Sequence, residues 1–307
     1  MPLQKLQFQS GINKESTSYA NEGGWFDCDK VRFRSGFPEK IGGWEKIGNN
    51  SFLGTCRALH PWRTLGLDLF LGLGTSSKYY IESGQGYYDI TPLRETTAAG
   101  GATFARVGVG DATLTVADPS HGAFAGDFVT FSGAASLGAD ITAAILNQEY
   151  QIDTIVDSNS YKIKARAVAT VDSITVDGVY TPTLITAASG DSGNGGGSIV
   201  AAYQVSTGLN SSVFGTGWGA GTWGRNTWGS AASLTLTDLL RIWTHDNFGE
   251  DLIINVRDGD IYLWDASAAQ ALSTRATSLA ARAAAAGLTG APTVATKVIV
   301  SDVDRHV

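Results

Sequence analysis

The chain has 307 residues and a net charge of −7, because 29 Asp and Glu outnumber 22 Lys and Arg. This acidic balance argues against a dedicated nucleic-acid binder, and a hydrophobic content of 43% excludes a wholly disordered chain. The two cysteines, Cys28 and Cys56, are too few for a disulfide scaffold or a four-ligand zinc site. No apolar run reaches the roughly 18 residues of a membrane-spanning helix, and the first residues lack the pattern of a signal peptide.

The N-terminal segment, residues 7–47, combines a polar arm with two Gly-Gly-Trp turns and a basic strand, VRFR. Successive side chains of a strand point to opposite faces, so Arg32 and Arg34 share one face while Val31 and Phe33 share the other. We predict that both arginines point outward. They either pair with acidic side chains of this chain or contact a partner protein.

Short segments rich in β-branched and aromatic residues follow one another along the chain, each bounded by turn residues. They indicate strands at residues 68–74, 78–82, 128–132, 161–165, 252–256 and 261–264. Many short strands with frequent turns predict an all-β fold built as a sandwich, a barrel or a propeller.

An internal repeat favours the propeller. Asp68-Leu69 corresponds to Asp251-Leu252, and aromatic strands follow both dipeptides after a polar turn. Residues 57–93 and 235–267 are therefore predicted to form similar sheets side by side, as blades of a β-propeller-like core that is incomplete in this chain. Two β-meanders within a sandwich are the alternative. Alternation from Thr296 indicates the first strand of a third unit.

A Gly-rich, weakly hydrophobic flank lies at each end of residues 96–197, and such sequences are typical of flexible connectors. The predicted organisation is an N-terminal arm with the first blade in residues 1–95, a small inserted β module in 96–197, and further blades in 198–307 that continue beyond Val307. Helices are expected at residues 276–286, ending before Gly287, and at 141–146 with Asp140 as N-cap.

The sequence offers no catalytic constellation. Its four histidines are not at the spacing of metal ligands: His60, His121, His245 and His306. The first and third fall in corresponding strands of the repeat, which favours a structural role. Asp-rich turns at residues 191–194 and 302–304 lack the calcium loop that ends in Glu. We therefore predict no catalytic residue, metal ligand or cofactor site, and no enzymatic activity.

The most unusual stretch is FGTGWGAGTWGRNTWG, residues 214–229, in which Trp218, Trp223 and Trp228 recur every five residues, each followed by Gly. Glycine permits tight turns and tryptophan supplies large apolar surface. The segment either packs against its own domain or offers aromatic anchors to a partner. Stacking of a carbohydrate on the indole rings is a third possibility.

Several of these motifs resemble the tail structural, or stabilisation, proteins of short-tailed bacteriophages. The resemblance rests on residues 11–47 (GINKESTSYANEGGWFDCDKVRFRSGFPEKIGGWEKI), GTCRALHPW, the Trp-rich stretch and NFGEDLIINVRDGDIYLWDAS, and it covers roughly residues 1–95 and 198–307. It implies a tail nozzle or hub of the virion, in which β-propeller subunits form a homo-oligomeric ring, a hexamer, below the portal and adaptor and next to distal tail or fibre proteins. DNA passes through the channel without specific binding. The family has no catalytic residues to transfer.

Two functions remain open at this stage. The first is a non-enzymatic component of a phage tail ring that takes part in DNA ejection, for which the acidic balance suits a channel that must not grip DNA. The alternative is a glycan-binding or glycan-cleaving propeller used for host adsorption, supported by the tryptophans of residues 214–229. Hydrolysis of a glycan would require two carboxylates beside the scissile bond.

Overall fold

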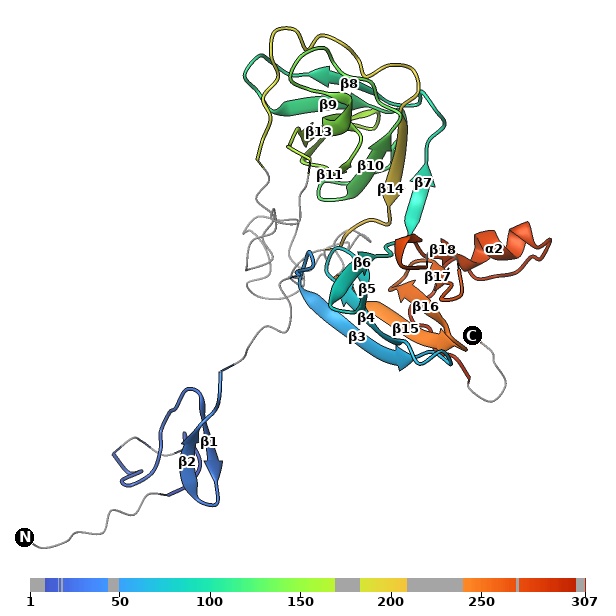
Figure 1. The fold of residues 1–307 in the computed structure, drawn as a ribbon. Coiled ribbons are helices and arrows are strands. Elements are labelled where there is room, and N and C mark those ends of the chain that lie inside the picture. The colour runs from blue at the N-terminus through green and yellow to red at the C-terminus, as the bar shows by residue number, and fades with distance from the viewer. Residues whose placement is uncertain are drawn as a thin grey trace, which may run out of the picture. The chain divides into compact units, whose positions relative to one another are not determined.

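The computed structural model describes residues 9–15, 17, 19–43, 50–168, 183–208, 240–268, 271–301 and 307. The chain divides into two units, Met1–Asn49 and Asn50–Val307. Within the described part the regular structure is β apart from three short helices, and the strands form antiparallel sheets (Figure 1). The predicted all-β, propeller-like fold class is confirmed.

The N-terminal unit is built on one hairpin, β1 (Val31–Arg34) and β2 (Phe37–Lys40). Its two-residue turn, Ser35-Gly36, has positive φ at both positions (51° and 84°), which is the geometry that suits the twist of paired strands. Trp25 of the first Gly-Gly-Trp turn lies edge-on to Phe33 with ring centroids 6.0 Å apart. None of the described side chains of this unit belongs to the buried core.

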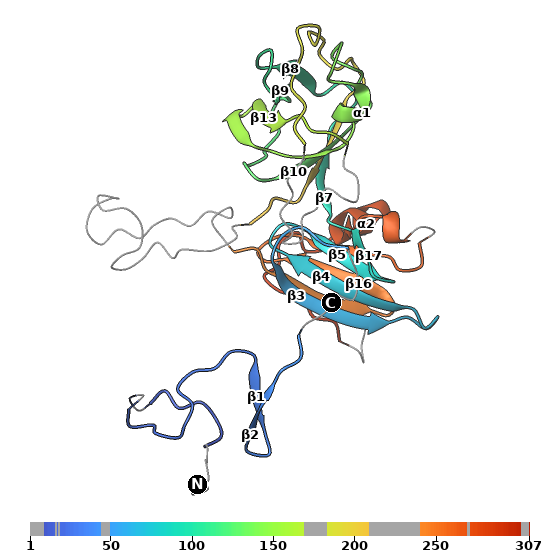
Figure 2. The same ribbon diagram turned by 60° about the vertical axis from the view of Figure 1, so that its left-hand side comes forward.

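Two four-stranded sheets form the blades of the second unit. The first blade has β3 (Cys56–Arg63), β4 (Leu69–Thr75), β5 (Tyr79–Ser83) and β6 (Gly86–Asp89) in that order. The second blade has β15 (Trp243–Phe248), β16 (Asp251–Val256), β17 (Ile261–Trp264) and β18 (Thr277–Ser278) in that order. The two sheets are separate and lie against each other, as the repeat predicts (Figure 2).

The blades share one hydrophobic core between their inner faces. It includes Tyr79 and Ile81 from the first blade and Trp243, Ile254 and Trp264 from the second. Successive residues of each strand alternate between this core and the opposite face, so each sheet presents an apolar side to the other.

The outer face of the second blade is covered by the C-terminal part of the chain. Ile253 and Ile261 are buried there with Val298, and α2 (Leu279–Ala285) packs nearby through Leu279. The strand expected from Thr296 is absent from described residues 296–301, so that prediction is wrong. The reason is that the amides of this segment donate to side chains of β15: Val298 N to Thr244 Oγ1 at 3.1 Å and Val300 N to Asp246 Oδ2 at 2.8 Å.

A two-sheet module is inserted in the chain after the first blade and before the second. One sheet has the order β11 (Glu149–Gln151), β10 (Phe128–Ser132), β14 (Val200–Gln204), β7 (Leu93–Thr96), and the other β12 (Thr154–Asp157), β13 (Ser160–Lys164), β9 (Thr113–Ala117), β8 (Thr103–Arg106). Phe104 and Phe131 meet in its core with ring centroids 4.8 Å apart. The sheets extend from residue 93 to residue 204, and β7 pairs with β14 where the chain leaves and re-enters the blades.

The Gly-rich segment at 187–197 belongs to the module's hydrogen-bonded structure and is not the flexible connector that its composition indicates. The carboxylate of buried Asp191 accepts hydrogen bonds from the backbone N–H groups of Ala139, Asp140, Ile141 and Ala188, at 2.7–3.2 Å. Glycine is required close by: a Cβ on Gly138 would lie 2.1 Å from the carbonyl oxygen of residue 190. Asp191 is therefore occupied by amides rather than poised for a cation.

Both predicted helices are present, with different starts. In α2 the Ser278 hydroxyl accepts from Ala281 N at 3.2 Å, and Gly287 follows the helix with φ of 73°, as expected of a glycine stop. The other helix, α1, spans Ala143–Leu146 and has Thr142 at its N-cap, so the expectation of Asp140 there is wrong. The amide of Asp140 is instead held by Asp191.

We predict that Asp191→Ala destabilises the module by about 2 kcal/mol, because it leaves buried amides without an acceptor. Burial acts to raise the pKa of Asp191, but the four backbone N–H groups hold it below its ordinary value. The carboxylate's contribution is therefore complete above the ordinary Asp pKa and is lost as the pH falls below about 4. Urea unfolding at neutral and acid pH measures both effects.

Asp140→Ala is the matched control, since the Asp140 side chain is exposed in the same loop. It should change the unfolding free energy little. Equal losses in the two variants would contradict the assigned role of Asp191.

Candidate functional site

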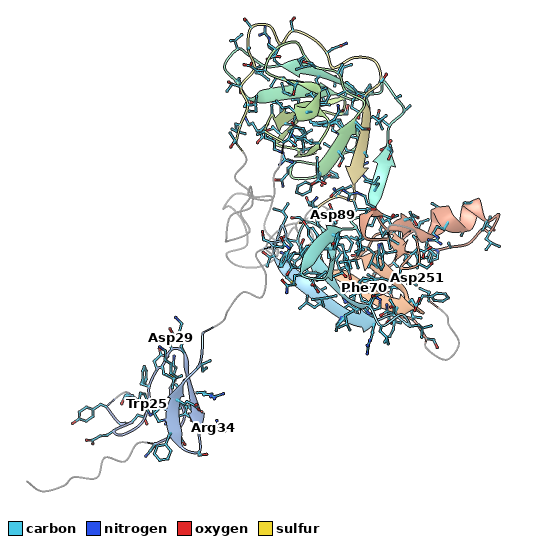
Figure 3. All side chains as sticks on the ribbon, viewed as in Figure 1. Trp25, Asp29, Arg34, Phe70, Asp89 and Asp251 are labelled. Atoms are coloured by element: carbon cyan, nitrogen blue, oxygen red, sulfur yellow. The ribbon has the colours of Figure 1, made fainter. Side chains whose placement is uncertain are left out.

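The two arginines singled out in the sequence lie on the outward face of β1. Arg32 and Arg34 are exposed while Val31 and Phe33 are half-buried, which matches the expected alternation. Arg32 Nε lies 3.2 Å from Glu39 Oε2 of β2, an intrachain ion pair. Arg34 stands at the turn end of the hairpin (Figure 3), opposite Phe37 in register. A partner contact by this face remains a prediction.

The other residues proposed for an interface, Trp218, Trp223 and Trp228, lie outside the described residues, as does the turn at 302–304. The choice between self-packing, protein contact and carbohydrate stacking for these tryptophans therefore stays a prediction.

Histidines from the two blades meet at the seam between them. The rings of His60 on β3 and His245 on β15 have centroids 4.8 Å apart. His60 Nε2 lies 2.5 Å from Asn247 Oδ1, and His245 Nδ1 lies 3.0 Å from the Tyr79 hydroxyl. Burial, assisted by His60, lowers the pKa of His245 to about 4. Both imidazoles thus take part in joining the blades.

Aromatic rings extend this seam along the blades. Trp62 and Phe70 of the first blade lie edge-on to Trp264 of the second, with ring centroids 6.2 Å and 5.6 Å apart. Phe70 is labelled within the blade pair in Figure 3. Such edge-to-face pairs add to the free energy of apolar burial. The seam is therefore an extended packing surface.

A group of charges around one buried lysine, which the sequence analysis does not predict, lies where both blades meet the module. Lys78, immediately before β5, is 4% exposed, and its Nζ lies 2.8 Å from Asp89 Oδ2 and 2.5 Å from Glu149 Oε1. Burial alone would lower the pKa of Lys78, but the two carboxylates raise it above its ordinary value. Burial likewise acts to raise the pKa of Asp89, and Lys78 with Arg275 lowers it. We refer to Lys78, Asp89, Glu149 and Arg275 as the junction charges.

Glu149 links one sheet of the module to both blades. It belongs to β11 of the module, receives Lys78 from the first blade, and lies 3.5 Å from Arg275 Nη2, just before β18 of the second blade. Gln204 of β14 also donates to its carboxylate. The sequence hints at this site only through a single lysine, Lys78, placed before an apolar strand. That pattern does not identify Glu149, 71 residues further along the chain, as its partner.

A separate feature is the outer face of the first blade. Leu59 and Pro61 of β3 point away from the seam and are exposed, as is Leu69 of β4 at 70%. The loop between these strands adds Leu65, exposed by 90%, and Leu67, which has φ of 72°. Only the other end of the face is covered within the described chain, by Phe52 against Tyr80 and Tyr87. The apolar patch of Leu59, Pro61, Leu65, Leu67 and Leu69 is hereafter the open face.

The described residues offer neither a metal site nor a membrane-spanning helix. No group of three or more His, Cys, Asp or Glu side chains in that part of the chain is arranged to hold a metal ion. No helix there is long and apolar enough to cross a membrane.

Comparisons with known proteins do not identify a family. No protein-family model matches the chain, and no curated protein matches it. Among solved structures, the Phage phi92 endosialidase matches with 14% identity and a TM-score of 0.20, over 74% of this chain and 30% of that one. The chain thus spans less than a third of that phage protein, and a TM-score this low supports neither a common fold nor a common activity.

We predict that the blade pair loses stability as the pH falls from about 7 to 5. An unfolded chain takes up a proton at His245 near the ordinary His pKa of 6.5, whereas the folded chain does so only near 4. The stabilisation is therefore complete above about pH 6.5 and is lost progressively below it. Melting curves at both pH values should show a fall of several degrees.

His245→Gln isolates this effect, because glutamine offers polar atoms to Tyr79 without titrating. Its melting temperature should be lower at neutral pH and should fall less on acidification. If wild type and variant respond identically to pH, the seam histidines do not set the acid response.

Proposed function

We propose that this chain is a structural component of a phage tail, a subunit of the nozzle or hub ring through which DNA leaves the particle. The proposal starts from the resemblance of residues 11–47 and 214–229 to tail proteins of short-tailed phages. The structural observation that supports it is the open face of the first blade, which is exposed while the inner face of the same blade packs against the second blade.

The two blades pack face to face, and the open face is the outer surface of the first blade. In the second blade the corresponding outer face is covered by Val298 and α2, so the stack is closed at that end. In the first blade Leu59 and Leu69 remain exposed, by 57% and 70%. Exposed apolar patches of this kind mark interaction sites, and in a ring one face of each subunit meets a different face of the next.

The N-terminal unit supports the same assignment. Its described part is a hairpin without a buried core, and an isolated two-stranded hairpin is marginally stable in water. Tyr19 is 94% exposed and Phe37, beside Arg34, is 75% exposed. Aromatic and arginine side chains together are typical of interface hot spots. We propose that this unit contacts neighbouring subunits, or the adaptor, portal or distal tail proteins of the virion.

The proposed role is mechanical and non-enzymatic. His60 and His245, the histidines that correspond in the repeat, are engaged in blade packing, which suits a structural element better than a catalytic one. The net charge of −7 suits the wall of a channel that lets a phosphate backbone pass.

We predict that the purified protein assembles into a closed ring, a hexamer, and that Leu59→Lys with Leu69→Lys prevents assembly by charging the open face. Val156→Lys is the matched control, because Val156 is an exposed strand residue of the module. Light scattering after size-exclusion chromatography gives the mass, and circular dichroism checks the fold. A protein that is monomeric both at micromolar concentration and in the virion would overturn the proposal.

Removal of residues 1–43 should also release monomers while the blades stay folded, because no described side chain of this unit belongs to the buried core. A glycan array with the same protein tests the alternative. Specific glycan binding lost on replacing Trp218, Trp223 and Trp228 by Ala would favour host adsorption over the ring.

A further inference from the structure

We infer that Glu149 and the other junction charges form a latch that couples the inserted module to the spacing between the two blades. As a consequence, a force or a bound ligand that displaces the module also changes the packing at the seam between the blades. This inference concerns a single chain and is independent of the ring.

The first blade contributes Lys78, whose side chain reaches into the module. Its Nζ lies 2.5 Å from Glu149 Oε1 and 4.7 Å from the ring centroid of Phe128 on β10. An ammonium over an aromatic face is favourable when desolvated. Lys78 is therefore held by two strands of the module as well as by Asp89 of its own blade.

The second blade contributes Arg275, which reaches the same two carboxylates. Its Nη2 lies 3.3 Å from Asp89 Oδ2 and 3.5 Å from Glu149 Oε2, and its Nη1 donates to the Thr91 carbonyl at 2.8 Å. Asp89 and Glu149 thus each contact a cation from either blade. A change in blade spacing must lengthen at least one of these contacts.

The two chain crossings between blades and module are also packed. Ile90 and Val205, on the outgoing and returning segments, are buried in the blade core, and Val205 N donates to the Pro92 carbonyl at 3.1 Å. On the return, Asp127 of the module accepts from Thr207 N at 2.8 Å. These two chain segments fix where the module is attached to the blades. The junction charges add ion pairs from the module to each blade.

The charges act as a unit because they are balanced and share one buried member: two cations face two carboxylates, with the Lys78 side chain 5% exposed and the other three 22–26% exposed. Removing one partner of a buried ion pair is strongly destabilising, since the remaining charge stays out of water without compensation. Loss of Glu149 therefore affects Lys78 and Arg275 together, and through them both blades.

Hydrogen exchange followed by mass spectrometry on the full chain tests the latch. In Glu149→Gln we expect exchange of amides in β3 and β15, the strands that carry His60 and His245, to rise about tenfold at neutral pH. Glu95→Gln is the control, since Glu95 also belongs to a module strand but its side chain is 52% exposed, and within the described part of the chain its ion pair is with neighbouring Arg94 at 3.4 Å. A rise confined to the module, or an equal rise in both variants, would overturn the inference.

If Glu149→Gln does not fold, hydrogen exchange of the wild-type protein in urea tests the same coupling. Exchange is followed at increasing urea below the unfolding transition. Module amides of β10 and β11 and seam amides of β3 and β15 should open together, at the same urea concentration. Opening of the module at clearly lower urea, with the seam still protected, would contradict the coupling whatever the oligomeric state.

Discussion

The second unit depends on one constraint: two four-stranded sheets, each apolar on one side, bury those sides against each other. The close approach of the sheets needs glycine at position 74 of β4, because a Cβ there would lie 2.8 Å from the Trp243 ring of the second blade. Within the first blade, Gly72 leaves room for the Tyr79 hydroxyl, which would lie 2.6 Å from a Cβ at that position. Tyr79 in turn reaches His245, so packing and hydrogen bonding fix the same register. Every other feature is attached to this pair of blades.

The outer faces of the two blades differ in how much of their apolar surface the rest of the chain covers. The C-terminal segment covers the outer face of the second blade, and the module is held through Lys78, Glu149 and Arg275. The open face at Leu59 and Leu69 has no such cover within the described chain. This uncovered apolar face is what links the fold to the proposed tail ring, because exposed apolar patches mark interaction sites.

Much of the fold could be predicted because it depends on local patterns. Strand alternation located β4, β5, β10, β13, β16 and β17 to within about a residue, and the Asp-Leu repeat anticipated two like sheets. Long-range polar contacts could not be predicted. Asp191 captures amides some 50 residues earlier, and Glu149 meets a lysine 71 residues before it, with no sequence pattern linking the partners. The expected strand at Thr296 failed because side chains of β15 took its amides.

We propose that the open face of the first blade is a subunit interface in a phage tail. Electron cryo-microscopy of the intact particle tests it most directly, since the map shows which surface lies against Leu59 and Leu69. We expect a closed ring in which a neighbouring copy buries this face and the blades surround the DNA channel. Finding the chain outside the channel axis, with the face in solvent, would contradict it.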